Sequence, residues 1–252
     1  MLSKSKIKLL TQLKSKKYRE LNNMFIVEGS RNVLDFLQTP NSCIEIFATV
    51  NWLQKNELSI SDKNTITVTE DELKKITALK TPSEALAIFK LPNTTFNGKL
   101  ITDNLTIALD SISDPGNLGT IIRTADWFGI DHIYCSKNTV DAFNPKVVQA
   151  TMGSLSRVSV IYTDLDKLMA SKPKDLPVFG AVLNGTSINE IKPQANGIIL
   201  IGSEAHGISP SLTKFITNKI TIPLYNLSST SNPESLNAAI ANAIICYALK
   251  IK

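Results

Sequence analysis

Polar residues with the chemistry to handle a hydroxyl group or a phosphate lie in three separate segments of this 252-residue chain. Amides and hydroxyls orient a substrate, a carboxylate accepts a proton, and a guanidinium binds a phosphate. These residues are Asn117 and Arg123 in DPGNLGTIIRTA, Glu204 in GSEAHGIS, and Ser235 and Asn237 in IPLYNLSSTSNPESLNAA. Each segment alone also has a purely structural interpretation, as a capping Asn, a solvated Arg, a tight turn or a capping cluster.

The first segment predicts a strand, a loop and a helix between Ala108 and Ile130. An apolar run ends in a loop of Ser, Asp, Pro, Gly and Asn, which is typical of a buried strand that stops at a turn. Apolar residues then recur at helical spacing, at Ile121, Ile122, Ala125 and Phe128. Asn117 is expected to be the N-cap, and Gly129 the C-terminal stop.

The other two segments also follow predicted strands. GIILIG precedes the loop that carries Glu204, and KITIPL precedes the third loop. Ser235 and Asn237 are expected in the first turn of an apolar helix over 234–249. Strands alternate with helices over residues 100–252, which predicts an α/β fold with a mostly parallel sheet and helices on both faces. Ligands of such sheets bind at the carboxyl ends of the strands, where these loops lie.

Several function classes are disfavoured by what the chain lacks. The first segment has neither the Lys-Ser/Thr of a P-loop nor a full GxGxxG, which argues against an NTPase and a nucleotide-dependent oxidoreductase. Cys43, Cys135 and Cys246 form no CxxC pair, and the chain has only two histidines, so no metal is expected. The apolar runs are too short to span a bilayer, and the expected compartment is the reducing cytoplasm.

Basic residues are concentrated at the N-terminus. The chain carries a net charge of +5, and its first twenty residues hold one acid and seven basic residues: Lys4, Lys6, Lys8, Lys14, Lys16, Lys17 and Arg19. A local basic face suits a polyanion such as RNA. A solvated helix end and an organellar transit peptide are the alternatives.

The chain is predicted to form two domains. Residues 1–91 have a mixed α/β pattern, and Leu91–Lys99 has the composition of a linker, so the predicted domains are 1–95 and 100–252.

In this order, the three segments resemble the three motifs of the SpoU (TrmH-like) family of RNA ribose 2′-O-methyltransferases, within the SPOUT superfamily. The resemblance covers nearly the whole chain, because residues 105–250 are similar to the catalytic domain and residues 7–37 to the N-terminal substrate-binding domain of the ribosomal-RNA branch. It implies S-adenosylmethionine as cofactor, ribosomal RNA as partner, a homodimer and a C-terminal trefoil knot. The loop Tyr225–Pro233 is longer than in the usual third motif.

The resemblance also assigns roles to individual residues. Arg123 is implied to be the essential catalytic residue, with Asn117, Glu204, Ser235 and Asn237 orienting substrate or supporting the active site. The residues implied to line the cofactor pocket are Leu183, Gly202, Ile222 and Leu236. Because a guanidinium does not act as a base in water, Arg123 is expected to bind an RNA phosphate and stabilise the developing alkoxide.

Some alternatives stay open at this stage. A neutral Arg123 acting directly as the base would need strong desolvation. His206 is interpreted as a loop residue rather than a general base. Trp127 is expected to be buried by packing, with stacking on RNA or a place in the dimer interface as the alternatives. A catalytically inactive RNA-binding protein on the same scaffold, and transfer RNA as the substrate, are the alternatives to a ribosomal RNA methyltransferase.

Overall fold

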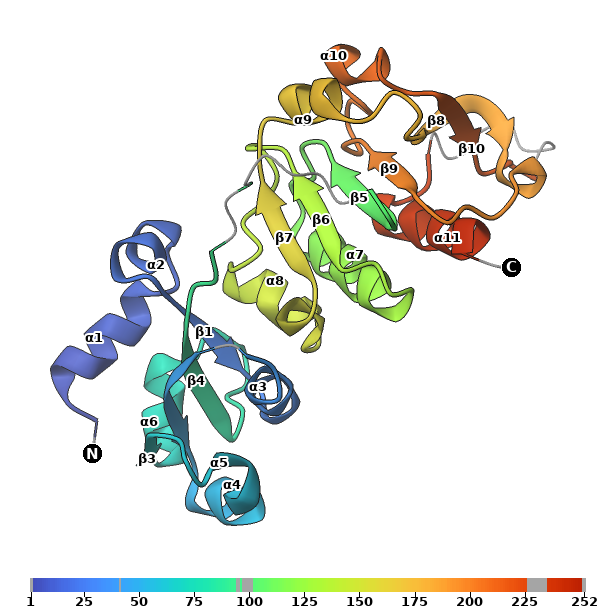
Figure 1. Ribbon diagram of the computed structural model, residues 1–252. Helices are drawn as coiled ribbons and strands as arrows, with labels where there is room; N and C mark the ends of the chain where they lie inside the picture. Colours follow the sequence, from blue (N-terminus) through green and yellow to red (C-terminus); the bar gives the residue numbers. More distant parts are fainter. Residues whose placement is uncertain (1, 41, 94–95, 97–101, 226–234, 251–252) are drawn as a thin grey trace. The chain divides into compact units, whose positions relative to one another are not determined.

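The computed structural model describes residues 2–40, 42–93, 96, 102–225 and 235–250. The chain forms two compact units, and each contains its own β-sheet (Figure 1). Unit 1 comprises Met1–Asn93 together with Asp141–Arg157, and unit 2 comprises Thr94–Val140 and Val158–Lys252. A segment between two strands of unit 2 therefore packs as part of unit 1, which the sequence patterns did not indicate.

Unit 1 is built on a four-stranded sheet in the order β1-β4-β2-β3. Strand β4 is antiparallel to β1 and β2, and β3 is parallel to β2. The strands are β1 (Met24–Glu28), β2 (Cys43–Ala48), β3 (Thr65–Thr67) and β4 (Ala85–Lys90). The helices are α1 (Lys4–Gln12), α2 (Lys16–Asn22), α3 (Ser30–Leu37), α4 (Val50–Lys55), α5 (Glu57–Ile60), α6 (Glu70–Ile76) and α8 (Pro145–Ala150), followed by the short helix η1 (Ser154–Ser156).

Helix α1 is bound to the rest of unit 1 by apolar and polar contacts. Leu10 and Leu13 are fully buried beside Phe47 of β2, in one apolar cluster. The Lys6 ammonium donates to Glu45 at 2.6 Å, and the Lys14 ammonium donates to the Thr77 carbonyl at 2.6 Å. Part of the basic charge at the N-terminus is therefore used inside the unit.

The segment Asp141–Arg157 is attached to unit 1 through buried side chains. Arg19, which is 2% exposed, forms an ion pair with Asp141 at 2.5 Å and donates to the carbonyls of Leu13 and Lys14. The ring of Phe143 packs edge-on against Phe25, with centroids 4.8 Å apart. A buried arginine is tolerated because its charge is paired and its donors reach carbonyl oxygens.

Unit 2 is built on a six-stranded sheet in the order β10-β8-β9-β5-β6-β7, and every neighbouring pair is parallel. Its strands are β5 (Leu105–Leu109), β6 (His132–Cys135), β7 (Ser159–Tyr162), β8 (Val178–Ser187), β9 (Gly197–Ile201) and β10 (Asn218–Thr221). Its helices are α7 (Pro115–Trp127), α9 (Leu165–Ser171), α10 (Pro210–Thr213) and α11 (Ala238–Lys250), with the short helix η2 (Ile188–Glu190). The expected α/β fold with a parallel sheet is confirmed; the knot stays a prediction.

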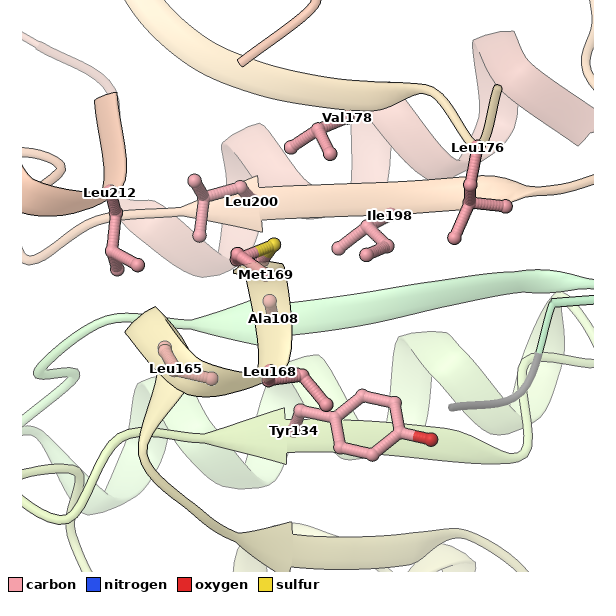
Figure 2. Packing of buried hydrophobic residues seen from close by; sticks show 10 residues of the cluster. All are labelled: Ala108, Tyr134, Leu165, Leu168, Met169, Leu176, Val178, Ile198, Leu200 and Leu212. Carbon is pink, nitrogen blue, oxygen red and sulfur yellow. The ribbon is translucent and has the colours of Figure 1, made fainter. Parts of the chain in front are cut away.

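Helices cover both faces of this sheet. On one face α9 packs Leu165, Leu168 and Met169 onto the central strands (Figure 2). The other face is covered by α7 and α11, which contact each other. Near-continuous apolar strands are expected for a parallel sheet buried on both faces, and all five residues of β5 and of β9 are buried. None of the helices in the described ranges has the length and hydropathy needed to span a membrane.

Candidate active site

The carboxyl ends of β5 and β9 define the edge of the sheet where polar residues gather. These two strands are neighbours, although the chain passes through β6, β7 and β8 between them. The direction in which strands are added to the sheet changes at this point, and such a switch point opens a crevice for ligands. The loop after β5 leads into α7, and the loop after β9 carries Glu204. The fold therefore brings two of the three sequence segments to one edge.

The start of α7 differs from the prediction in a way that frees Asn117. The N-cap is Asp114, whose carboxylate accepts from the Asn117 backbone N–H at 2.8 Å, and Pro115 is the first helical residue. Asp114 is the better cap because Pro115 needs no hydrogen bond at this position, so the helix begins there. Asn117 consequently lies in the first turn with its side-chain amide available. The predicted stop is confirmed: Gly129 follows the helix in the left-handed region, with φ +64°.

The amide of Asn117 links all three sequence segments. Its Nδ2 donates to Glu204 Oε1, and its Oδ1 accepts from Asn237 Nδ2 at 2.9 Å. Both ends of the amide are therefore engaged, and they fix its orientation. Residues that are 87 and 120 positions away from Asn117 in the sequence meet at one side chain. We call Asn117, Glu204 and Asn237 the amide–carboxylate network.

Glu204 lies at the tip of a tight loop. Ser203 and Gly207 exchange backbone hydrogen bonds of 3.1 and 2.9 Å, which closes the loop. A Cβ on Gly202 would lie 2.1 Å from the Gly207 carbonyl carbon, so no other residue fits there. The glycine at position 202 is thus required by the loop itself. Glu204 and His206 are both exposed on this loop.

Asn237 caps α11 rather than lying in its first turn. Its Oδ1 accepts from the backbone N–H groups of Ala239 at 3.0 Å and Ile240 at 3.3 Å. The helix begins at Ala238, four residues later than predicted. The cap fixes the Asn237 side chain, so its Nδ2 points to Asn117. Ser235 is exposed and outside the helix, and it makes no side-chain hydrogen bond within the described ranges. The segment 226–234, which holds most of the long loop Tyr225–Pro233, lies outside the described residues.

Arg123 lies apart from the amide–carboxylate network. It follows Asn117 by six residues on α7, which corresponds to about 9 Å along the helix axis. Its side chain is exposed and has no hydrogen-bond or ion-pair partner in the part of the chain described. This exposure does not provide the desolvation that a neutral arginine base would need. Trp127, one turn further on, is 84% exposed, so the prediction that it is buried was wrong.

The four residues predicted to line a cofactor pocket are only partly brought together by the structure. Strand β8 pairs with β10 at Gly180↔Lys219 and again at Thr186↔Ile220, and the residues between them leave the ladder. Between these two pairs the Leu183 carbonyl accepts from the Thr221 hydroxyl at 3.0 Å. Leu183 therefore lies beside Thr221, the residue that precedes Ile222. Leu183 is 69% exposed and Leu236 47% exposed. No hydrogen bond joins Gly202 to Ile222 or Leu236 in the described residues.

Thiol and metal chemistry find no support at this site. The three cysteines are free, and burial raises the pKa of Cys43 to about 11 and that of Cys246 to about 12. A thiol with so high a pKa is not a nucleophile near neutral pH. Within the described ranges, no three His, Cys, Asp or Glu side chains are grouped so that they could hold a metal ion.

Sequence reasoning missed two residues of this region. Asp114 carries the cap that had been assigned to Asn117, and the DPG sequence, with proline directly after an aspartate, was the signal for it. Asp110, directly after β5, is 7% exposed and accepts from the Ser209 backbone N–H at 2.8 Å. No pattern marked Asp110, because its partner lies 99 residues away.

These features define a class: a parallel α/β domain with a polar site at its topological switch point, joined to a smaller α/β unit. Comparison with known proteins gives the family. Residues 104–247 match the model of the SpoU rRNA Methylase family, and residues 4–87 match an MRM3-like substrate binding domain. The chain belongs to the SpoU rRNA methylase family, as its three motifs predicted.

Similar proteins extend over both units. The chain is 32% identical to the 23S rRNA (guanosine(2553)-2′-O)-methyltransferase RlmP of Bacillus subtilis, with 97% of this chain and 96% of that protein covered. It is 38% identical to a TrmH-family protein of known structure from Porphyromonas gingivalis, with a TM-score of 0.87 over 99% of this chain and 98% of that one. An AdoMet-bound rRNA methyltransferase from Sinorhizobium meliloti is 25% identical, with a TM-score of 0.83 over 99% and 96% of the two chains.

Proposed function

We propose that this protein transfers a methyl group from S-adenosylmethionine to a ribose 2′-hydroxyl of ribosomal RNA. The observation that carries the proposal is the amide–carboxylate network, which joins all three family motifs at the switch point of the sheet. RlmP of Bacillus subtilis, which is similar over nearly the whole chain, is named for this reaction on 23S rRNA.

The residues of unit 2 suit the proposed cofactor. A flat adenine ring needs apolar surfaces and nearby backbone polar groups. Leu183 and Leu236 expose 69% and 47% of their surface, which is costly for leucine unless a ligand covers it. With Gly202 and the half-buried Ile222, they are the residues that would hold S-adenosylmethionine. When bound, the cofactor would supply the methyl group from its sulfonium centre, and the neutral thioether S-adenosylhomocysteine would be the leaving group.

The chain's own residues then have to position the ribose and remove its proton. The 2′-oxygen forms the new bond to the methyl carbon as the carbon–sulfur bond breaks, and the hydroxyl proton is lost. Asn117, held at both ends, orients the substrate, and the exposed carboxylate of Glu204, which Asn117 contacts, is the proposed proton acceptor, directly or through water. Ser235 and Asn237 support this arrangement, Asn237 by fixing Asn117. Alignment of the two reactants supplies up to roughly 7–11 kcal/mol of the barrier reduction.

Arg123 has the role of phosphate ligand and alkoxide stabiliser. Its guanidinium is exposed and has no partner among the described residues, so its donors are available to an RNA phosphate. A guanidinium binds phosphate through two parallel hydrogen bonds, which a lysine ammonium cannot reproduce. A guanidinium that binds the phosphate beside the reacting ribose also stabilises the negative charge that develops on the 2′-oxygen.

Residues 1–95 are proposed to bind RNA and residues 100–252 to carry the catalytic site. The match to a substrate binding domain over residues 4–87 supports this division. Lys4, Lys8 and Lys17 are exposed and have no partner among the described residues, so they remain available for phosphate contacts. Lys4 and Lys8 are four residues apart on α1 and therefore share one face.

A homodimer is also proposed, through the exposed face of α7 and α11. Trp127, Ile240 and Tyr247 are 84%, 50% and 58% exposed, and large apolar side chains gathered on neighbouring helices favour a protein contact. Light scattering should report twice the chain mass, and Trp127→Glu together with Tyr247→Glu should halve it. A monomeric wild type would contradict the dimer. The proposed compartment is the cytoplasm, where free thiols and ribosomal RNA coexist.

The test of the reaction is methyl transfer from tritiated S-adenosylmethionine to unmodified ribosomal and transfer RNA, with Arg123→Ala beside the wild type. Label on ribosomal RNA that depends on Arg123, located to a ribose by modification mapping, is the expected result. Label on transfer RNA alone would show that the substrate is transfer RNA and not ribosomal RNA. No label on either RNA, with no cofactor binding by calorimetry, would replace the proposal with a catalytically inactive RNA-binding protein.

A further inference from the structure

Asp110 is a buried carboxylate at the switch point that the proposed reaction does not use. It follows β5 directly and is only 7% exposed. Oδ2 accepts from the Ser209 backbone N–H at 2.8 Å, and Oδ1 accepts from the Ser111 hydroxyl at 3.1 Å. Its own backbone N–H donates to the Ile201 carbonyl at 2.9 Å. Burying a carboxylate is costly unless its oxygens are satisfied, so both contacts stabilise the fold there.

The backbone around Asp110 is held from the neighbouring strand as well. Ser111 has φ +61°, a left-handed conformation that costs energy for a residue other than glycine. The Ser111 N–H donates to the Ser136 hydroxyl at 2.9 Å, and that hydroxyl lies 3.2 Å from Thr139 Oγ1. The loops after β5, β6 and β9 are therefore joined by hydrogen bonds around one carboxylate, and the strained backbone at Ser111 is maintained by them.

The Ser209 contact fixes the far end of the loop that bears Glu204. At its near end this loop continues from β9, and its middle is closed by the bonds between Ser203 and Gly207. The return of the chain at Ser209, where α10 begins, is bonded to Asp110. The hydrogen bond between Asp110 and Ser209 therefore helps to place Glu204 against Asn117. It also helps to place Gly202 in the proposed cofactor pocket.

We propose that Asp110 is a positioning residue for methyl transfer: it anchors the Gly202–Ser209 loop so that this loop can bind S-adenosylmethionine and present Glu204 to Asn117. The inference rests on the proposed function. Asp110 touches neither cofactor nor substrate and acts through the loop. A carboxylate suits this task because it accepts in two fixed directions and forms charge-assisted bonds to the Ser209 N–H and the Ser111 hydroxyl.

Two substitutions remove the anchor from opposite sides. Asp110→Ala removes the acceptor. Ser209→Pro removes the donor at a φ of −59°, which proline accepts. It also puts a ring carbon against Asp110 and removes the hydroxyl that lies 3.4 Å from Ser211 Oγ. Asp110→Asn is the conservative variant, since its Oδ1 can still accept from the Ser209 N–H. Asp164→Ala is the matched control: Asp164 also accepts from a backbone N–H, at 3.2 Å from Lys167, but it caps α9 and has no hydrogen bond to Gly202–Ser209 among the described residues.

Cofactor affinity by calorimetry and the separate kcat and KM values form the readout. We expect Asp110→Ala and Ser209→Pro each to weaken S-adenosylmethionine binding and raise its KM about tenfold, to lower kcat, and to leave the KM for RNA within about twofold. Asp110→Asn should stay within about threefold of the wild type. The double variant should be no worse than either single one, because both break the same bond.

The proposal would be overturned if folded Asp110→Ala and Ser209→Pro kept the cofactor affinity and kcat of the wild type. It would also be overturned if their losses in affinity and kcat only equalled those of Asp164→Ala, or if the losses of the two single variants added up in the double variant. If Asp110→Ala does not fold, Ser209→Pro and Asp110→Asn carry the same comparison. Hydrogen exchange at 202–209 separates this inference from the proposed function. If the wild type does not methylate RNA but Ser209→Pro loses exchange protection, the proposed reaction is wrong and the anchoring role of Asp110 is supported. If exchange at 202–209 is unchanged in Ser209→Pro, the anchoring role is wrong.

Discussion

In unit 1 three of the basic residues near the N-terminus, Lys6, Lys14 and Arg19, bond to their own unit, whereas in unit 2 the motif residues bond to one another or remain exposed. Arg19 is 2% exposed and ion-paired with Asp141, and Lys6 and Lys14 donate to Glu45 and to a carbonyl. Arg123 in unit 2 is exposed and unpaired among the described residues. The same residue type therefore serves stability at position 19 and is available for function at position 123.

The difference shows that charge in a sequence does not by itself mark a binding surface. The prediction of a basic N-terminal face counted seven basic residues, but the side chains of Lys6, Lys14 and Arg19 are used inside unit 1. The motif residues of unit 2 carry little net charge, yet their polar atoms are concentrated at one edge. Substitutions of the paired residues in unit 1 should therefore lower stability, whereas substitutions of the motif residues in unit 2 should lower activity.

The largest effect is expected at Arg123. Arg123→Ala should lower kcat about a thousandfold, and Arg123→Lys several hundredfold, because the loss of one group that stabilises transition-state charge lowers kcat by about 10²–10³ and lysine cannot replace the planar fork. Single-turnover methylation and RNA binding by filter assay are the measurements. Thermal stability should not change. Near-normal turnover of Arg123→Lys would contradict a need for the guanidinium geometry.

The opposite signature is expected at Arg19. Arg19→Ala should destabilise unit 1 by about 3–5 kcal/mol, because it leaves Asp141 without the partner of a buried ion pair. Urea unfolding monitored by circular dichroism measures this change. The double variant Arg19→Met with Asp141→Leu should recover much of the loss. If Arg19→Ala instead kept its stability and lost only RNA affinity, the contrast between the two arginines would fail.

An intermediate effect is expected in the amide–carboxylate network. Asn117→Asp places a second carboxylate against Glu204, and kcat should fall about 10–100-fold at neutral pH. Activity should recover partly as the pH is lowered, because protonation of one of the two carboxyl groups removes the repulsion. The pH–rate profile is the measurement, with Asn189→Asp as a control outside the network. A profile parallel to that of the wild type would show that Asn117 and Glu204 do not interact during turnover.

The smallest effects are expected at the lysines that unit 1 leaves unpaired. Lys8→Ala and Lys17→Ala should each weaken RNA binding two- to fivefold and make the slope of log K against log salt shallower by about 0.7–0.9. Lys167→Ala, on α9 of unit 2, is the control with equal charge change. Equal losses for all three variants would mean that α1 and α2 contribute only general charge.

The sequence by itself determined the parallel α/β character of residues 100–252, because strands buried on both faces read as continuous apolar runs. It also located the three polar loops and the stop at Gly129, where left-handed backbone requires a glycine. The residues of the amide–carboxylate network were identified from motif resemblance, and each belongs to a separate segment of the sequence.

Tertiary structure decided how those residues act. The bond from Asn237 to Asn117, and the carboxylate of Asp110 beneath the Glu204 loop, join residues about a hundred positions apart, and no local pattern encodes such pairs. Likewise, Asp141–Arg157 lies between two strands of unit 2 yet packs in unit 1, where Asp141 is the partner that makes burial of Arg19 tolerable. Local patterns reflect backbone preference and burial, whereas the pairing of distant polar atoms follows from the path of the chain.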